Sequence, residues 1–198
     1  MAQDYDLILA SSSPRRRDYL EKMGVRFVIM KPDADETIMV GESPSDYVAR
    51  MAAEKAQIIA DLHPGEVVLA ADTIVVCHDM IIGKPTDRED AKRILRLLSG
   101  RTHEVMSAVC IIKDEVEKNF TVTTEVTFAP LSEELIDTYV ASGECDDKSG
   151  AYAVQGIASM FVAKVSGSVS AVVGLPICQV REALAEFGIK PRTVQAQG

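Results

Sequence analysis

The residues best suited to chemistry near the start of the chain are three serines, a proline and three arginines. Ser11 to Ser13 follow a short apolar run at 7–10, and Pro14 presets φ for the first turn of a helix. Where a strand ends and a helix begins, free backbone N–H groups face any ligand. Arg15 to Arg17 add positive charge where the helix dipole favours negative charge. The segment therefore predicts an anion site, with phosphate as the natural anion, and its alternative is a solvated basic helix start.

A single carboxylate, Asp72, interrupts the long apolar run 67–77. A continuous run of this kind is typical of a central strand covered on both faces. An unpaired charge buried there costs several kcal/mol, so Asp72 needs a partner, a hydrogen bond or a metal. We weigh a catalytic or metal-binding role against a structural, hydrogen-bonded core aspartate. A second carboxylate, Glu36, lies in an acidic loop at 31–37 that follows another predicted strand.

The hydrophobic pattern predicts the elements that position these groups. Strands are expected at 7–10, 26–30, 67–77, 103–112, 120–128 and 160–165, with a short hairpin turn at 78–79. Helices are expected to begin at Pro14, after Ser43, at a capping box of Thr86 and Glu89, after Ser132 and after 176. The alternation of the two kinds of element indicates an α/β fold.

Two lysines stand out within this framework. Lys55 lies one turn from Met51 and Ile59 on the second helix, so it either reaches inward or snorkels to water. Lys84 follows a glycine, which lets the backbone approach a ligand, and precedes a proline that stiffens the turn.

Composition limits the class of protein. The 198 residues predict one domain at 5–190, or two lobes sharing a cleft, with a polar, frayed tail at 191–198. A formal net charge of −9 argues against nucleic-acid binding. The acidic first residues argue against a signal peptide, and no apolar run approaches the roughly 20 residues of a membrane helix. The four scattered cysteines favour reduced thiols rather than disulfides or a zinc site, so we expect a cytoplasmic protein.

In its motifs, the chain resembles the Maf-like nucleoside triphosphate pyrophosphatases from about residue 7 to 187. The matching stretches are Leu-Ala-Ser-Ser-Ser-Pro-Arg-Arg (9–16), Asp-Glu (35–36), Ala-Asp-Thr (71–73), Gly-Lys-Pro (83–85), Leu-Ser-Gly-x-x-His (98–103), Gly-Glu-x-x-Asp-Lys-x-Gly-Ala-Tyr (143–152), Gln-Gly (155–156) and Val-Gly-Leu-Pro (173–176). Each stretch alone is weak evidence for the resemblance, but their shared order and spacing make it highly specific.

The resemblance implies a mixed, twisted β-sheet flanked by helices, with two lobes around a deep nucleotide-binding cleft. It implies that Asp72 is the proton acceptor and that a divalent cation, Mg²⁺, Mn²⁺ or Co²⁺, takes part. Carboxylate oxygens suit such ions, so Glu36 and Asp72 are the candidate ligands, and Asp72 is expected to act as base, as ligand or as both. The substrate-binding residues that it implies are Ser11, Ser13, Arg15, Arg16, Lys55, Thr73, Lys84, Lys148 and Gln155. Of these, Arg15, Thr73 and Gln155 are linked to the choice of base.

The implied reaction is hydrolysis of a nucleoside triphosphate to the monophosphate and pyrophosphate, in a house-cleaning role for the nucleotide pool. Ala-Asp-Thr together with Gln-Gly resembles the branch that acts on dTTP and UTP, with modified pyrimidine nucleotides as further candidates. One alternative is the branch that prefers 7-methyl-GTP. Another is a non-catalytic, nucleotide-binding regulator of septum formation. The partners expected are a nucleoside triphosphate and, as an open alternative, a second copy in a homodimer, with no membrane.

Overall fold

The computed structural model describes residues 4–195. Its strands are β1 (Leu7–Leu9), β2 (Phe27–Ile29), β3 (Val68–Cys77), β4 (Met80–Ile82), β5 (Thr102–Lys113), β6 (Val116–Phe128) and β7 (Val162–Ser166). Its α-helices are α1 (Pro14–Lys22), α2 (Pro44–Leu62), α3 (Arg88–Leu98), α4 (Glu133–Ala141), α5 (Val169–Val173) and α6 (Ile177–Glu186). Two short 3₁₀ helices, η1 (Ser149–Ala151) and η2 (Ile157–Met160), lie between α4 and β7.

Within the described residues, the strands form one mixed seven-stranded sheet in the order β2-β1-β3-β5-β6-β7, and β4 pairs with β3. β1 runs parallel to both β2 and β3, with Leu7 opposite Phe27 and Ile8 opposite Val68. β4 is antiparallel to β3, and β7 is antiparallel to β6. The α/β class and the mixed sheet expected from the sequence are therefore confirmed.

The chain divides into two compact units, which are described separately. The first unit comprises the described residues of Met1–Asp72, Ser107–Thr121 and Gly174–Gly198. The second comprises Thr73–Met106 and Val122–Val173. Three strands, β3, β5 and β6, contribute residues to both units.

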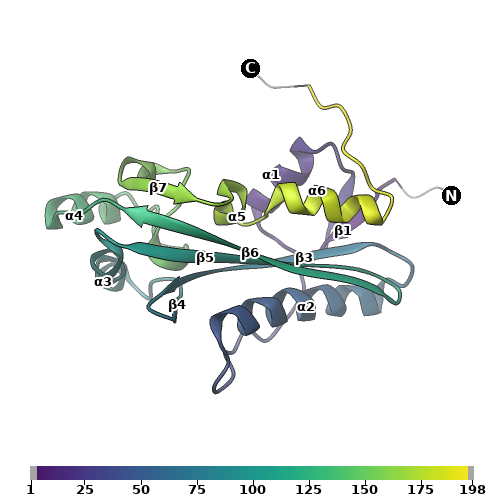
Figure 1. Ribbon diagram of the computed structural model, residues 1–198, viewed down its shortest axis with the longest axis horizontal. Coiled ribbons are helices and arrows are strands. Elements are labelled where there is room, and N and C mark those ends of the chain that lie inside the picture. Colours follow the sequence, from purple (N-terminus) through teal and green to yellow (C-terminus); the bar gives the residue numbers. More distant parts are fainter. Residues whose placement is uncertain (1–3, 196–198) are drawn as a thin grey trace. The chain divides into compact units, whose positions relative to one another are not determined.

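Helices cover both faces of the strands in the first unit. Leu7, Leu9 and Leu69 are fully buried in a cluster with side chains of α1 and α6. Because side chains alternate along a strand, Ile8 and Val68 point to the other face, along which α2 lies in Figure 1. Burial on both faces explains why β1 and the first half of β3 are continuously apolar.

The second unit has its own core, in which α3 packs against α4 and η1. Aromatic rings form its centre: Phe128 makes edge-to-face contacts with His103, Tyr152 and Phe161, with ring centroids 4.8–5.1 Å apart. Tyr139 of α4 extends the cluster, with its ring 5.0 Å from that of Phe161. These contacts hold the irregular segment 144–161 against the sheet strands of this unit.

The helix starts illustrate how local chemistry sets the elements. Ser13, Ser43 and Ser132 each accept a hydrogen bond from a backbone N–H of the first helical turn, as the sequence predicts. The capping box predicted for Thr86 and Glu89 is wrong. Asp87 is the N-cap of α3, and its carboxylate accepts from the Asp90 N–H at 2.8 Å.

Two other boundaries differ from the sequence prediction. The hairpin between β5 and β6 has a two-residue turn at 114–115, because both strands continue well beyond their apolar centres. The strand expected to begin at Met160 begins at Val162, since Met160 still belongs to η2. The segment after β7 contains the short helix α5, for which the hydrophobic pattern gave no signal.

The polar tail is attached to the first unit through Arg192. Its backbone N–H donates to the Met23 carbonyl at 2.9 Å, and its guanidinium pairs with the Asp6 carboxylate. A Cβ at Gly24 would lie 2.5 Å from the Arg192 carbonyl oxygen, so the tail runs close against this turn. The predicted fraying therefore does not extend to Arg192, and residues 196–198 lie outside the described residues.

Candidate functional site

A lysine bridges the two carboxylates singled out in the sequence. Lys55 Nζ donates to Asp72 Oδ1 at 2.9 Å and to Glu36 Oε1 at 2.7 Å. The side chains of Lys55 and Asp72 are 15% and 13% exposed, whereas that of Glu36 is 62% exposed. Asp72 is therefore the inner member of the group, and Glu36 faces solvent. Of the two alternatives for Lys55, reaching inward is the one observed.

Helix α2 positions this group. Tyr47, Met51 and Lys55 are spaced four residues apart, so they share one face of the helix. The Tyr47 hydroxyl donates to the Glu36 backbone carbonyl at 2.8 Å and holds the acidic loop over that face. Arg50 fixes the same loop further along, donating to the Thr37 carbonyl at 2.9 Å and pairing with Glu42 at 2.6 Å.

The serine and arginine turn forms the second part of the site in the first unit. Ser11 is buried, and its Oγ accepts from the Ser13 N–H at 3.1 Å and from Arg16 Nη1 at 3.3 Å. Arg16 Nε also donates to the Gly174 carbonyl at 2.8 Å, which fixes the direction of the guanidinium. Arg15 is exposed on the first turn of α1. The turn thus presents one anchored and one exposed arginine.

Electrostatics connects the turn to the carboxylates. Burial lowers the pKa of Arg16, while the Asp72 and Glu36 carboxylates oppose that lowering. Burial, followed by the same two carboxylates, raises the pKa of Tyr47, so its hydroxyl stays a donor at neutral pH. The first unit therefore gathers arginine, lysine and two carboxylates into one charged group with hydroxyls beside it.

In the second unit, the segments that carry Lys84 and Lys148 lie side by side. The Gly150 N–H donates to the Gly83 carbonyl at 3.1 Å. Gly150 has φ +71°, and a Cβ there would lie 2.9 Å from a methyl of Val75, so this close approach requires glycine. Lys84 is exposed, and the Lys148 ammonium pairs with the adjacent Asp147 carboxylate at 3.0 Å. Both lysines are thus presented from neighbouring backbone.

Gln155 lies on the same irregular segment and is exposed. It is followed by a turn in which the Gly156 N–H donates to the Ala153 carbonyl at 3.0 Å. Beneath the segment, Nε2 of buried His103 lies 2.7 Å from the Tyr152 hydroxyl oxygen. Burial lowers the pKa of His103 to about 4, so the ring is neutral at pH 7 and serves packing and hydrogen bonding.

Thr73, directly after Asp72 in β3, is half-buried.

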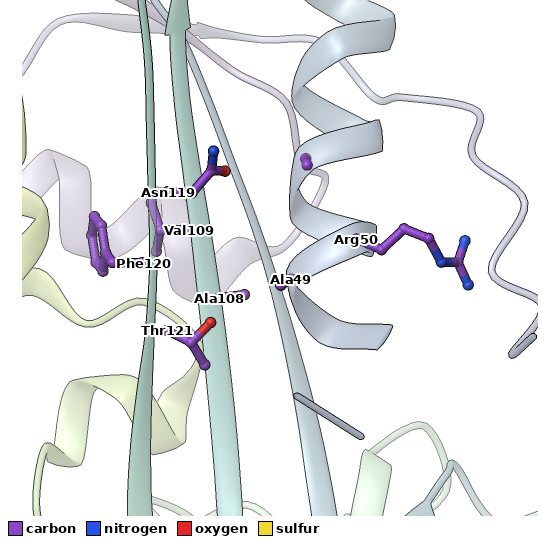
Figure 2. A pocket seen from close by; sticks show the side chains of 8 residues that line it. Ala49, Arg50, Ala108, Val109, Asn119, Phe120 and Thr121 are labelled. Atoms are coloured by element: carbon purple, nitrogen blue, oxygen red, sulfur yellow. The ribbon is translucent and has the colours of Figure 1, made fainter. Parts of the chain in front are cut away.

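Within residues 4–195, a metal-type cluster is not found, and the groove of Figure 2 lies apart from the predicted site residues. Among residues 4–195 no group of three or more His, Cys, Asp or Glu side chains is placed to hold a metal ion. Figure 2 shows an open groove of about 400 Å³ in the first unit, between α2 and the strands β5 and β6. Arg50 extends away from these strands, and the lining contains none of the predicted site residues. Among the described residues no helix is long and apolar enough to cross a membrane.

Sequence reasoning missed three residues that organise the site. Tyr47 was not singled out, although its spacing of eight from Lys55 places both on one helix face. Arg50 and Glu144 were not singled out. Arg50 donates to the Thr37 carbonyl, and Glu144 accepts from the backbone N–H groups of 157 and 158. These partners lie in distant or irregular segments, so no sequence pattern indicates the contacts.

Comparison with known proteins shows the family to which the chain belongs. The model of the family described as Maf-like protein matches residues 6–187, so the chain belongs to this family. A protein of Anaeromyxobacter dehalogenans (strain 2CP-C) named dTTP/UTP pyrophosphatase is 50% identical over 186 residues, covering 92% of this chain and 94% of the relative. A protein of Vibrio parahaemolyticus with the same name is 45% identical, over 94% of this chain and 100% of the relative. One from Bacillus mycoides (strain KBAB4), again so named, is 49% identical over 91% and 95%.

Proposed function

We propose that this protein is a nucleoside triphosphate pyrophosphatase that hydrolyses dTTP and UTP to the monophosphate and pyrophosphate. Relatives that are 45–50% identical over nearly the whole chain carry the name dTTP/UTP pyrophosphatase. The observation that carries the chemistry is the inner carboxylate Asp72, held by Lys55 and electrostatically coupled to Arg16. A protein that only binds nucleotide has no need of a buried carboxylate beside a phosphate site.

The turn after β1 is proposed to bind the phosphates. The N-terminus of α1 carries the positive end of the helix dipole, and Arg16 offers a guanidinium anchored by the Gly174 carbonyl. Arg15 and the hydroxyls of Ser11 and Ser13 add further donors. Because these groups are already fixed before substrate binds, little ordering is needed when the triphosphate arrives.

Asp72 is proposed to be the general base. Hydrolysis to a monophosphate and pyrophosphate adds water across the anhydride between the α and β phosphates. The water oxygen bonds to phosphorus, the bridging oxygen leaves with one product, and the Asp72 carboxylate accepts the proton that the water loses. Lys55 holds this carboxylate in place through the hydrogen bond from Nζ to Oδ1 at 2.9 Å.

The two carboxylates are the proposed site of a divalent cation. The Lys55 ammonium already places positive charge within 2.9 Å of both Asp72 and Glu36, so the pair accommodates a cation. Carboxylate oxygens are the donors that Mg²⁺ and Mn²⁺ prefer, and we propose that Glu36 and Asp72 hold such an ion, or Co²⁺. When bound, it would neutralise phosphate charge.

For the remaining residues we propose substrate contacts: Lys84 and Lys148 with the phosphates, and Thr73, Gln155 and Arg15 in the choice of base. A Gln amide offers one donor and one acceptor, which matches the O4 and N3–H edge of uracil and thymine.

The test is a comparison of kcat/KM for dTTP, UTP, CTP, GTP and 7-methyl-GTP. Phosphate release is measured with added inorganic pyrophosphatase, so that only pyrophosphate production gives a signal above a control without that enzyme. We expect dTTP and UTP to lead. Preference for 7-methyl-GTP would reassign the substrate, and binding without turnover would refute the enzyme.

A further inference from the structure

We propose that Glu144 is a positioning residue for base selection, which fixes the backbone of residues 156–158 and thereby orients Gln155. The inference rests on the proposed function, in which Gln155 contacts the base. It assigns the origin of that selectivity to a carboxylate eleven residues before Gln155, on the loop after α4.

The Glu144 carboxylate accepts three hydrogen bonds. Oε1 accepts from the Ile157 N–H at 2.7 Å. Oε2 accepts from the Ala158 N–H at 3.2 Å and from the Tyr139 hydroxyl at 2.7 Å. The two N–H groups open the helix η2, whose N-cap, Gly156, has no side chain to satisfy them. Glu144 thus caps η2 from a distant part of the chain, with a negative charge where the N–H groups favour one.

Gly156 is required by this contact. A Cβ at position 156 would lie 1.8 Å from Glu144 Oε1 and 2.6 Å from Cδ. The φ of Gly156 is −97°, which any residue adopts, so the need for glycine is steric rather than conformational. The carboxylate therefore occupies the space that a side chain at 156 would take, directly beside Gln155.

Gln155 depends on its backbone for orientation. Its side chain is exposed, so packing does not hold it in one place. The turn from Ala153 to Gly156 fixes it on one side, and the Glu144 bonds to Ile157 and Ala158 fix the chain immediately after it. Since a misplaced donor or acceptor loses much of its discrimination, releasing Glu144 reduces selectivity between bases.

The experiment compares UTP with CTP, which share sugar and phosphates and differ at the base edge. The ratio of kcat/KM for UTP to that for CTP is measured for the wild type, Glu144→Gln, Gly156→Ala and Gln155→Ala. In Glu144→Gln, either placement of the amide turns an N–H group toward a backbone N–H, so one bond is lost. We expect this ratio to fall about tenfold in Glu144→Gln and in Gly156→Ala.

A double variant tests whether Glu144 acts through Gln155. Glu144→Gln combined with Gln155→Ala should give the ratio of Gln155→Ala alone, because the oriented group is already absent. Tyr139→Phe is the milder variant if Glu144→Gln folds poorly, since it removes one donor to the carboxylate and keeps the ring in the core; its ratio should fall about threefold. Ile136→Val, which trims the same helix on its buried face, is the control: its Tm should fall and its ratio stay unchanged.

Several results would overturn the inference. If Glu144→Gln and Tyr139→Phe lower Tm but keep the wild-type ratio, Glu144 has only a structural role. Additive effects of Glu144→Gln and Gln155→Ala would show that it does not act through Gln155. A wild type that hydrolyses neither UTP nor CTP would refute the proposed function itself, and the inference with it.

Discussion

Replacing Asp72 with asparagine should separate catalysis from folding. In the wild type, Lys55 Nζ donates to Asp72 Oδ1 at 2.9 Å and to Glu36 Oε1 at 2.7 Å. The asparagine Oδ1 can still accept from Lys55, and Lys55 keeps its ion pair with Glu36. No buried charge is therefore left unpaired. The loss is that of an ion pair replaced by an ammonium–amide hydrogen bond, or ~1–2 kcal/mol. A domain of this size typically has about 5–15 kcal/mol of unfolding free energy, so we expect Asp72→Asn to stay folded.

Catalysis should respond on a different scale. Loss of a general base costs about 10²–10⁴ in rate, and weaker cation binding would add to that. The assay is pyrophosphate release from dTTP at saturating metal, with circular dichroism melting on the same samples. Asp61→Asn is a matched control, because Asp61 is an exposed carboxylate of α2 that accepts from Gln57. If folded Asp72→Asn kept kcat within about tenfold of the wild type, Asp72 would be a structural aspartate and the mechanism would be wrong.

Three further predictions concern the proposed phosphate-binding residues, the proposed metal ion and the ion pair between Asp6 and Arg192. Arg16→Ala and Lys84→Ala should each lower kcat/KM about 10- to 150-fold for every nucleotide accepted, whereas a loss confined to one base would assign the residue to base reading. Exhaustive chelation should abolish turnover and added Mg²⁺, Mn²⁺ or Co²⁺ should restore it, and full activity without metal would contradict the carboxylate pair as its ligands. The Arg192 hydrogen bond lowers the pKa of Asp6 well below its usual range. The contribution of ionised Asp6 to the free energy of unfolding is thus present above an aspartate's ordinary pKa of about 4 and is lost as pH falls below that value. Arg192→Ala should flatten the acid side of a urea-midpoint profile, and an unchanged profile would mean that the Arg192–Asp6 pair contributes nothing measurable.

The sequence alone determined most of the framework. Serine before proline at 13–14 and 43–44 marked two helix starts, because capping depends on residues that are neighbours in the chain. The long apolar run at 67–77, interrupted only at Asp72 and Thr73, marked the central strand, since a strand covered on both faces does not alternate. The lone carboxylate in that run marked Asp72, because an unpaired charge does not persist in such a place. Each of these signals is local, so one chain suffices to detect it.

Tertiary structure decided which groups meet. Lys55, Glu36 and Asp72 come from a helix, a loop and a strand, and no spacing in the chain gives the 2.7 and 2.9 Å that join them. The Glu144 carboxylate reaches the backbone of 157 and 158 because α4 and the following irregular segment fold around one aromatic core. The N-cap of α3 is Asp87 rather than Thr86. Two possible capping residues stand next to each other in the chain, and only the dihedral angles of the folded turn decide which of them caps the helix. Such contacts depend on the packing of segments distant in the chain, which residue order leaves open until the core forms.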